Sequence, residues 1–527
     1  MKLQLNWRSS RALLGPLVLS LPFLALSYHA TQSFFLSNSH AHLLEKAMLA
    51  LDRGRFELVG FVYPPLPFAV LLALPNIWFA TALSAFAGGL IAWMLWTKSL
   101  AELAFPRCVK IAMLLTFMLA PGTLYLATQS VAEILSLLLF VAAWLHYLKF
   151  TRSGETRSGF IAGLILGKGF FVSPLAAVYG VIYALCIPLF ARDKKPGVMA
   201  AGAVVLAFPV LAAFGSWLYM NWIFTGDALR FIHDPASSLF VHSRPDAAEF
   251  PTGWSLSWRA SARELMLTPM FVAAAALIGW RRPIRAVALI VPLAVTTLLR
   301  TMGLVFPEYL AVGTYSVVAL AGLPRTLPRR LWPVFLIACA LQLTAAYSMP
   351  MRGEMRAYFR MILDGKPQPR DLEEIKVASQ LRRMPRNSVL VDDRVAYRIV
   401  ARAATVKPFV LPADSAYNLA ELRPADHVEQ VLVPSKPLSV IGRVAGMYAR
   451  QRPDGFSEGL AWPSWRLLRN VAQPMGQEHA FGRLVLRGEV RIAAAARRGV
   501  REPSPDKNPG DARVVQFPQP QIENRGL

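Results

Sequence analysis

Charged side chains at the edges of long apolar segments are the first candidates for chemistry in this chain. Glu133 lies three residues after Ser130, where one apolar run gives way to the next, and Lys168 lies between two glycines within the apolar stretch 159–190. A charge at membrane depth is costly unless it is hydrated, paired or bound to a ligand, so a functional role is the first hypothesis for both residues. The Glu133 carboxyl suits acid chemistry or cation binding, and Lys168 suits an anionic group.

Each of these residues also has a purely structural explanation. A glutamate in the first turn of a helix is favoured by the helix dipole alone, and a lysine at a helix end extends its ammonium group to the membrane surface. Arg300 ends another apolar segment and either pairs with Glu308 across a short connection or faces a lipid phosphate. Asp392 and Asp393 end a predicted strand, where aspartates are more often turn residues than ligands.

A second group of candidates lies in the polar connection between the first two apolar segments, residues 30–63. Its imidazoles and carboxylates are His40, His42, Glu45, Asp52 and Glu57. Taken singly, each is predicted to be a solvated loop residue. His40 and His42 are two positions apart, so on a helix they point in different directions and make a poor metal pair. In the other long connection, 220–264, the histidines and acids show no metal or triad spacing.

The first connection has two halves that would position these side chains. Apolar residues recur at helical spacing in its first half and predict an amphipathic helix; they are Leu43, Ala47 and Leu51 with Leu44 and Met48. The run Tyr63-Pro64-Pro65-Leu66-Pro67 cannot continue a helix and predicts a rigid re-entry into the next apolar segment. We interpret this connection as the working surface of the protein rather than as a merely long connector.

The composition indicates a membrane protein. Of the 527 residues 55% are hydrophobic, with a mean hydropathy of +0.40, against about 45–50% in soluble domains. Apolar runs recur through the first 350 residues at the length of about 17–25 residues that a bilayer core requires. The net charge is +24, but much of the basic charge sits in short tracts between the apolar runs, as cytoplasmic anchors do, which argues against a nucleic-acid partner. The three cysteines lie in or beside apolar segments and indicate no disulfide or metal framework.

Placing the basic tracts in the cytoplasm predicts the path of the chain. We expect about eleven helices, at about 12–29, 66–96 with a break at Pro75, 111–128, 131–148, 159–167, 171–190, 198–219, 265–280, 284–300, 308–323 and 331–349. The N-terminus is then cytoplasmic, and the connections 30–63 and 220–264, the turn at Lys168 and all residues after 350 lie outside.

The last third of the chain has a different character. Residues 351–475 mix polar and apolar residues in globular proportions, with strand-like runs at 388–391, 408–411 and 430–433 and helical patterns at 371–383 and 394–404. They predict a small extracytoplasmic α/β domain beyond a transmembrane domain of residues 1–350. Residues 476–527 form a basic and then proline-rich tail that we predict to be largely disordered.

The arrangement resembles the GT-C-fold glycosyltransferases of the lipid A aminoarabinose transferase and protein mannosyltransferase kind. The resemblance covers roughly residues 10–350 and is carried by three stretches: EKAMLALDRGRF with YPPLPFAVLLAL, LAPGTLYLATQSVAEILSLLLFVAAWLHYL, and GFIAGLILGKGFFVSPLAAV. It implies a polytopic α-helical membrane protein with a GT-C-like fold in the cytoplasmic (inner) membrane. It further implies transfer of a sugar from a polyprenyl-phosphate carrier to an envelope glycan, lipid or protein acceptor on the outer face.

The resemblance also implies roles for the candidate residues. An inverting attack needs an outer-loop carboxylate as base, a basic residue on the carrier phosphate and, in some members, a divalent cation held by acids. We therefore expect Glu133 to act as acid or to bind the cation and Lys168 to bind the carrier phosphate. Arg300 joins the substrate-binding set, and His40, His42 and Tyr63 face the acceptor.

One feature departs from the family pattern. The family's catalytic aspartate stands about a dozen residues before the AML run, where this chain has Ser37-Asn38, and neither side chain is a carboxylate. Three explanations stay open: His40 or His42 replaces the base, Glu133 replaces it, or the chain has lost the reaction and binds a lipid-linked glycan in envelope assembly. A transporter of a lipid-linked substrate is a further alternative, against which stands the lack of an internal repeat.

Overall fold

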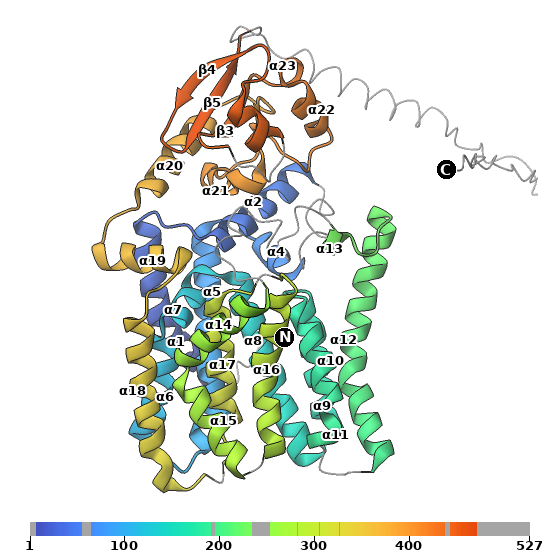
Figure 1. Ribbon diagram of the computed structural model, residues 1–527, viewed down its shortest axis with the longest axis vertical. Coiled ribbons are helices and arrows are strands. Elements are labelled where there is room, and N and C mark those ends of the chain that lie inside the picture. The colour runs from blue at the N-terminus through green and yellow to red at the C-terminus, as the bar shows by residue number, and fades with distance from the viewer. Residues whose placement is uncertain are drawn as a thin grey trace, which may run out of the picture. The chain divides into compact units, whose positions relative to one another are not determined.

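The computed structural model describes residues 7–54, 65–190, 195–233, 253–281, 283–304, 306–325, 327–437 and 443–471. The predictions for Tyr63, for 234–252 of the second long connection and for the tail 476–527 lie outside these residues. In the described part, apolar helices form a bundle, and a small mixed sheet flanked by helices lies at one end of it (Figure 1).

The helices of the bundle follow one another with short connections, except for the two long connections after α1 and α12. Its helices are α1 (Trp7–Gln32), α5 (Ile77–Lys98), α6 (Arg107–Leu119), α7 (Pro121–Gln129), α8 (Val131–Ser153), α9 (Thr156–Phe170), α10 (Leu175–Leu185), α11 (Ile187–Phe190), α12 (Pro196–Thr225), α14 (Trp254–Met266), α15 (Pro269–Arg281), α16 (Pro283–Thr301), α17 (Glu308–Gly322) and α18 (Trp332–Ser348). The connecting elements are α2 (Asn38–Arg53), α4 (Pro65–Leu71), η1 (Leu100–Glu102), α13 (Arg230–His233), η4 (Arg329–Leu331) and α19 (Gly353–Asp364).

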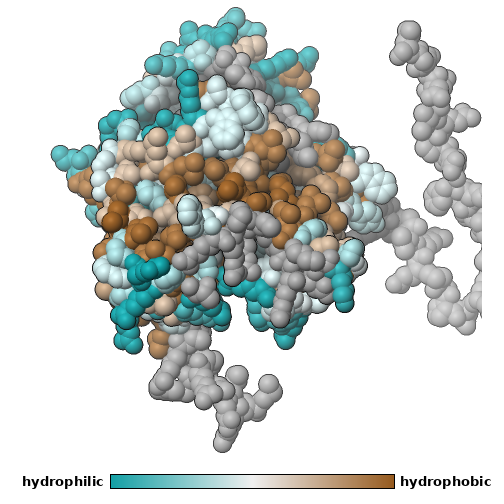
Figure 2. All heavy atoms as spheres, turned by 60° about the horizontal axis from the view of Figure 1, so that its bottom comes forward, coloured by the Kyte–Doolittle hydropathy of each residue, from teal (hydrophilic) through white to brown (hydrophobic). Residues whose placement is uncertain are grey.

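The bundle has the dimensions and surface of a membrane domain. Within the described residues five helices are long and apolar enough to cross a bilayer, and two bent pairs, α6 with α7 and α14 with α15, add up to two more spans. The pairs bend by 59° and 89°. Figure 2 shows a continuous band of hydrophobic surface across the bundle, with hydrophilic residues beyond it. The protein is therefore a multi-pass membrane protein, as the composition predicts.

Most predicted spans correspond to one apolar helix each, but 111–128 is divided into α6 and α7, which bend by 59°, and 171–190 is divided into α10 and α11. Two further corrections concern the boundaries of helices. The break at Pro75 is confirmed, since α4 ends at Leu71 and α5 begins after Asn76, whose side chain caps it. The break between 167 and 171 is misplaced, because α9 continues through Lys168 to Phe170 and the chain turns at 171–174. A Cβ at Gly167 would lie 2.8 Å from the Pro209 carbonyl oxygen, so this glycine serves close packing of α9 on α12 rather than a turn. The second correction is that 254–266 forms a helix of its own, α14, before the predicted span 265–280.

The C-terminal sheet has five strands in the order β2-β1-β3-β5-β4. Its elements are α20 (Pro369–Leu381), β1 (Val389–Leu390), α21 (Asp393–Ala403), β2 (Phe409–Val410), α22 (Tyr417–Leu422), α23 (Pro424–His427), β3 (Gln430–Pro434), η5 (Arg443–Met447), α24 (Tyr448–Arg450), β4 (Phe456–Ala461) and β5 (Trp465–Asn470). β1 pairs in parallel with β2 and β3, and β5 is antiparallel to β3 and β4. The three predicted strands are confirmed. The hairpin β4–β5 was not predicted, because β4 is largely exposed and lacks an apolar run.

The amphipathic helix predicted in the first connection is α2, and it lies between the bundle and the C-terminal sheet (Figure 1). Leu43 and Ala47 pack against α4 and α8, whereas Met48 and Leu49 join the core of the sheet. Because α2 is covered on both sides, most of its residues are buried, and the predicted apolar residue Leu51 is the one of the five that is exposed. This helix therefore links the two parts of the described chain.

Candidate functional site

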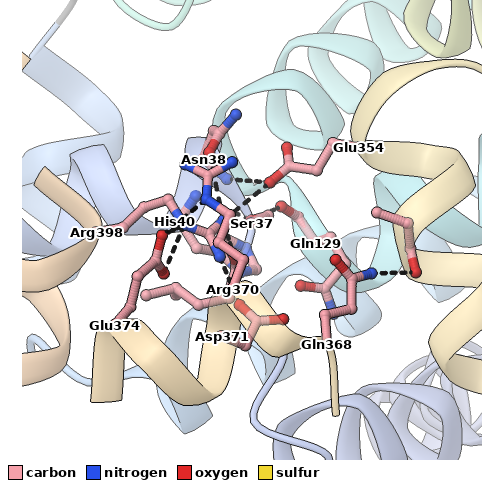
Figure 3. Close-up of polar contacts among 12 residues, drawn as sticks. Ser37, Asn38, His40, Gln129, Glu354, Gln368, Arg370, Asp371, Glu374 and Arg398 are labelled. Atoms are coloured by element: carbon pink, nitrogen blue, oxygen red, sulfur yellow. Dashed lines mark hydrogen bonds and ion pairs between the residues drawn. The ribbon is translucent and has the colours of Figure 1, made fainter. Parts of the chain in front are cut away.

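The first turn of α2 is the meeting point of several polar side chains (Figure 3). Ser37 caps the helix: its hydroxyl accepts the His40 N–H at 3.1 Å and donates to the Gln129 carbonyl at 2.5 Å. The next two residues each donate to a carboxylate from elsewhere in the chain. The Asn38 N–H donates to Glu354 Oε1 at 2.6 Å, and the Ser39 hydroxyl donates to Glu133 Oε2 at 2.9 Å. The positive end of the α2 dipole favours both carboxylates.

Glu133 lies in the first turn of α8, half-buried, and its carboxylate accepts from the hydroxyls of Ser39 and Ser130. Within the described residues Glu133 has no ion pair with a lysine or arginine. The predicted carboxylate therefore does approach the first connection, where the structure links it to α2 through Ser39.

Glu354 is a site residue that sequence reasoning missed. It lies in α19, its side chain is 20% exposed, and its carboxylate also accepts from the Tyr125 hydroxyl at 2.7 Å and contacts Arg398 at 3.3 Å. Burial raises the pKa of the Glu354 carboxyl, and the charge of Arg398 opposes that shift. The available signal was its position: an acidic residue six positions after the last span, on the side where the first connection lies.

His40 and His42 do not share surroundings. His40 is fully buried, with Nε2 lying 3.2 Å from the Ser84 hydroxyl, and burial lowers its pKa to about 3, so the imidazole is neutral. The His42 ring stacks on Tyr397, with 3.6 Å between ring centroids. The prediction that these loop residues are solvated is wrong for His40 and for Glu45, which is also fully buried.

Lys168 lies in the last turn of α9 with its side chain exposed. No described carboxylate forms an ion pair with it. Next to it, Gly169 lines a small cavity between α8, α9, α10 and α17. The cavity walls are mostly apolar, with Leu166, Leu175, Phe306 and Leu310 among the lining residues, and Ser136 of α8 completes one side. Since Ser136 is one turn beyond Glu133, the cavity runs between the helix that carries Glu133 and the helix that carries Lys168.

Arg300 lies apart from these residues. Its guanidinium group forms a buried ion pair with Glu264 of α14 and donates to the Phe306 carbonyl at 3.1 Å. Glu308, the partner suggested by the sequence, instead pairs with Arg263 at 2.9 Å. The expected pairing of Arg300 with Glu308 is therefore wrong. The bend between α14 and α15, which is not evident in the sequence, brings Glu264 to Arg300.

A dense charge network covers the other side of the α2 start. Arg398 of α21 binds Glu374 at 2.9 Å and Asp371 at 2.5 Å, and it also contacts the Leu36 carbonyl just before α2. Arg402 binds the same two carboxylates. The three acidic and basic groups at its centre, Arg398, Asp371 and Glu374, are 6%, 1% and 2% exposed. This network joins the C-terminal helices to the site.

Asp392 and Asp393 have structural roles in the described chain. The Asp392 carboxylate accepts the Arg394 N–H at the N-cap of α21, and Asp393 pairs with Lys46 of α2 at 2.7 Å. Asp392 therefore has the local capping role that is common for such aspartates, whereas Asp393 docks α2.

The surroundings of Glu133 do not fit a divalent cation. Its neighbours are two hydroxyls that donate to it, and no group of three or more His, Cys, Asp or Glu side chains suited to a metal occurs in the described residues. Magnesium and calcium require several oxygen ligands.

No protein-family model and no curated protein matches this sequence. Among solved structures, the chain is similar to ArnT from Cupriavidus metallidurans bound to undecaprenyl phosphate, with a TM-score of 0.51, 12% identity, and coverage of 88% of this chain and 99% of that chain. It is also similar to the arabinofuranosyltransferase AftD from mycobacteria, with a TM-score of 0.46, 15% identity, and coverage of 87% of this chain and 40% of that chain. The chain therefore has a GT-C-like fold, as the sequence resemblance predicts.

Proposed function

We propose that this protein is an integral membrane glycosyltransferase that transfers a sugar from a polyprenyl-phosphate carrier to an acceptor at the outer face of the cytoplasmic membrane. The observation that carries the proposal is the small apolar cavity between α8, which carries Glu133, and α9, which carries Lys168. Such walls suit an isoprenoid chain that enters between the helices, and the exposed Lys168, next to the lining residue Gly169, suits the phosphate. The solved structure of ArnT bound to undecaprenyl phosphate supports this partner, since the two chains share a fold.

In this proposal Lys168 acts on the donor and Glu133 acts on the acceptor. Lys168 holds the carrier phosphate and stabilises the negative charge that develops as the phosphate leaves. Glu133, held by Ser39 and Ser130, orients the acceptor group beside the first turn of α2. The predicted orientation places the N-terminus in the cytoplasm, so the first turn of α2 and the C-terminal sheet lie outside.

The test is a transfer assay on the purified full-length protein in liposomes. Undecaprenyl-phosphate-linked hexoses and pentoses labelled in the sugar are supplied as donors with an envelope lipid and glycan extract, and labelled acceptor and released undecaprenyl phosphate are measured. We expect transfer with one donor and a loss of about 10²-fold in rate in Glu133→Gln, because an acceptor that is no longer oriented reacts more slowly. The proposal would be overturned if the protein neither transferred sugar from any of these donors nor bound any of these lipids.

A second candidate function is binding of a lipid-linked glycan without transfer. The observation that favours it is the absence of a carboxylate at Ser37 and Asn38. Such a protein would bind undecaprenyl phosphate with a dependence on Lys168, would release no sugar from any donor, and would keep its cellular role in the Glu133→Gln variant.

A further inference from the structure

The first turn of α2 lacks an acidic side chain of its own, yet a carboxylate occupies its surroundings. Position 37 is a serine used as the helix cap and position 38 is an asparagine. Glu354, more than three hundred residues later, places Oε1 2.6 Å from the Asn38 backbone nitrogen. Figure 3 shows the Glu354 carboxylate directed toward Asn38 from α19. A separate helix therefore delivers the acidic group that the connection itself does not carry.

The contacts of Glu354 hold that group in one place and keep it ionisable. Oε2 accepts the Tyr125 hydroxyl at 2.7 Å, and Oε1 lies 3.3 Å from an Arg398 nitrogen. Glu354 is the least buried acid of this cluster, at 20% exposed, whereas Asp371 and Glu374 are sealed against arginines. A carboxylate that is positioned by fixed donors and still reaches solvent has the properties of a general base.

An observation independent of Glu354 indicates that a polar ligand belongs beside this turn. His40 Nδ1 and Gln129 Oε1 are buried at the α2 start and have no hydrogen-bond partner among the described residues. His40 is 0% exposed and Gln129 is 1% exposed, and such groups are costly to leave unpaired.

We propose that Glu354 is the general base of the transfer reaction, a role that rests on the proposed function. The acceptor hydroxyl or amine gives its proton to the Glu354 carboxylate as its oxygen or nitrogen forms a bond to the anomeric carbon of the donor sugar. The bond from the anomeric carbon to the phosphate oxygen breaks, and its electron pair leaves with the polyprenyl phosphate. The proton is then on Glu354, the sugar on the acceptor and the electron pair on the polyprenyl phosphate. Glu133 keeps its role of orienting the acceptor, and Lys168 keeps its role of binding the phosphate.

Three variants test this assignment in the liposome transfer assay. Glu354→Gln keeps the acceptor for the Asn38 N–H but cannot take a proton. Glu458→Gln removes an exposed glutamate on the edge strand β4 and serves as the matched control. Asn38→Asp combined with Glu354→Gln returns a carboxylate to the first turn of α2, with little change in shape. Position 38 already accepts from Arg398 at 3.3 Å, so an aspartate there is tolerated.

We expect Glu354→Gln to lose about 10²–10⁴-fold in transfer rate, with the control unchanged and the double variant recovering at least tenfold. The unfolding temperature of each variant is measured alongside. Glu354→Gln with full activity would overturn the proposal while leaving the proposed function intact. The proposal would also be overturned if Glu354→Gln lost activity together with its fold, as shown by a lowered unfolding temperature, and the double variant did not recover. Glu354 would then have a structural role. A wild-type protein inactive with every donor would instead overturn the proposed function, and the base role with it.

Discussion

The two sides of α2 differ in how their charged groups are paired. Toward the C-terminal sheet, Arg398 and Arg402 each contact both Asp371 and Glu374, and Arg53 binds Asp414 at 2.7 Å. Toward the bundle, three of the candidate residues are paired sparsely: Glu133 has two hydroxyls, His40 has one, and Lys168 is exposed without a described carboxylate. Arg300, paired with Glu264, is the exception.

The difference separates structural charges from candidates for chemistry. A buried charge with several partners is held in place and has no capacity left for a substrate, whereas a polar group with few partners can exchange one for a ligand. Glu354 lies between the two sides, since it contacts both Asn38 and Arg398. The comparison therefore predicts large stability effects on one side and activity effects with little loss of stability on the other.

The largest effect is expected from removing the centre of the paired side. Arg398→Met leaves Asp371 and Glu374 buried with fewer partners, which costs about 3–5 kcal/mol for a broken buried pair. Unfolding temperature of the purified protein in detergent is the measurement. Arg370→Met is the matched control, because Arg370 binds the same Glu374 at 2.9 Å but is 60% exposed, so its loss should cost less than about 1 kcal/mol. Equal losses of stability in Arg398→Met and Arg370→Met would contradict the distinction between buried charges with several partners and exposed ones.

On the sparsely paired side, Lys168→Met should weaken binding of undecaprenyl phosphate with little change in unfolding temperature. A charge-assisted hydrogen bond contributes about 1.5–3 kcal/mol, which corresponds to a loss of roughly 10–150-fold in affinity. Lys168→Arg should keep most of the binding. Lys149→Met at the opposite end of α8, where the side chain is 60% exposed and pairs with Glu155, is the control. An unchanged affinity in Lys168→Met would remove Lys168 from the site.

Sequence patterns predicted the local elements of this molecule well and their contacts less well. Apolar length located the spans, and the Pro75 break and three strands followed from local residue types. Among the elements that sequence missed, α14 and the exposed strand β4 carry too few apolar residues for such a pattern.

The site itself depended on contacts between distant segments. Ser39 with Glu133 and Asn38 with Glu354 are separated by 94 and 316 positions, so no spacing rule connects them. Glu45 and His40 carry polar groups that look solvated in a loop, but α2 is covered on two sides and both are buried. Arg300 pairs with Glu264 rather than with Glu308 because of the bend between α14 and α15, which the local sequence does not specify.

Glu45 offers a test of the α2 interface through pH. Burial raises its pKa from 4.5 to about 8, against the opposing charge of Lys46, whose nitrogen lies 3.4 Å away. The folded state therefore holds a proton that the unfolded state releases, so stability falls as pH rises from 4.5 toward about 8, by up to about 1.4 kcal/mol per pH unit. Glu45→Gln should remove this slope and be relatively more stable at high pH. Unfolding temperatures across that range measure it, with Glu458→Gln as control. If the unfolding temperatures of Glu45→Gln and Glu458→Gln changed with pH in the same way, Glu45 would not be the buried group that causes the pH dependence.

The smallest effects separate two neighbouring serines in the first turn of α2. Ser37→Ala removes the helix cap and should cost about 0.5–2 kcal/mol of stability. Ser39→Ala removes one hydroxyl from Glu133, a loss of about 0.5–1.5 kcal/mol that should appear as a roughly 2–12-fold lower transfer rate because Glu133 is less firmly oriented. Its unfolding temperature should stay close to that of the wild type. Transfer rate and unfolding temperature are measured for both variants. We expect Ser37→Ala to lower the unfolding temperature and Ser39→Ala to lower the transfer rate. If Ser39→Ala lowered stability and left transfer unchanged, Glu133 would belong with the structural charges on the other side of the helix.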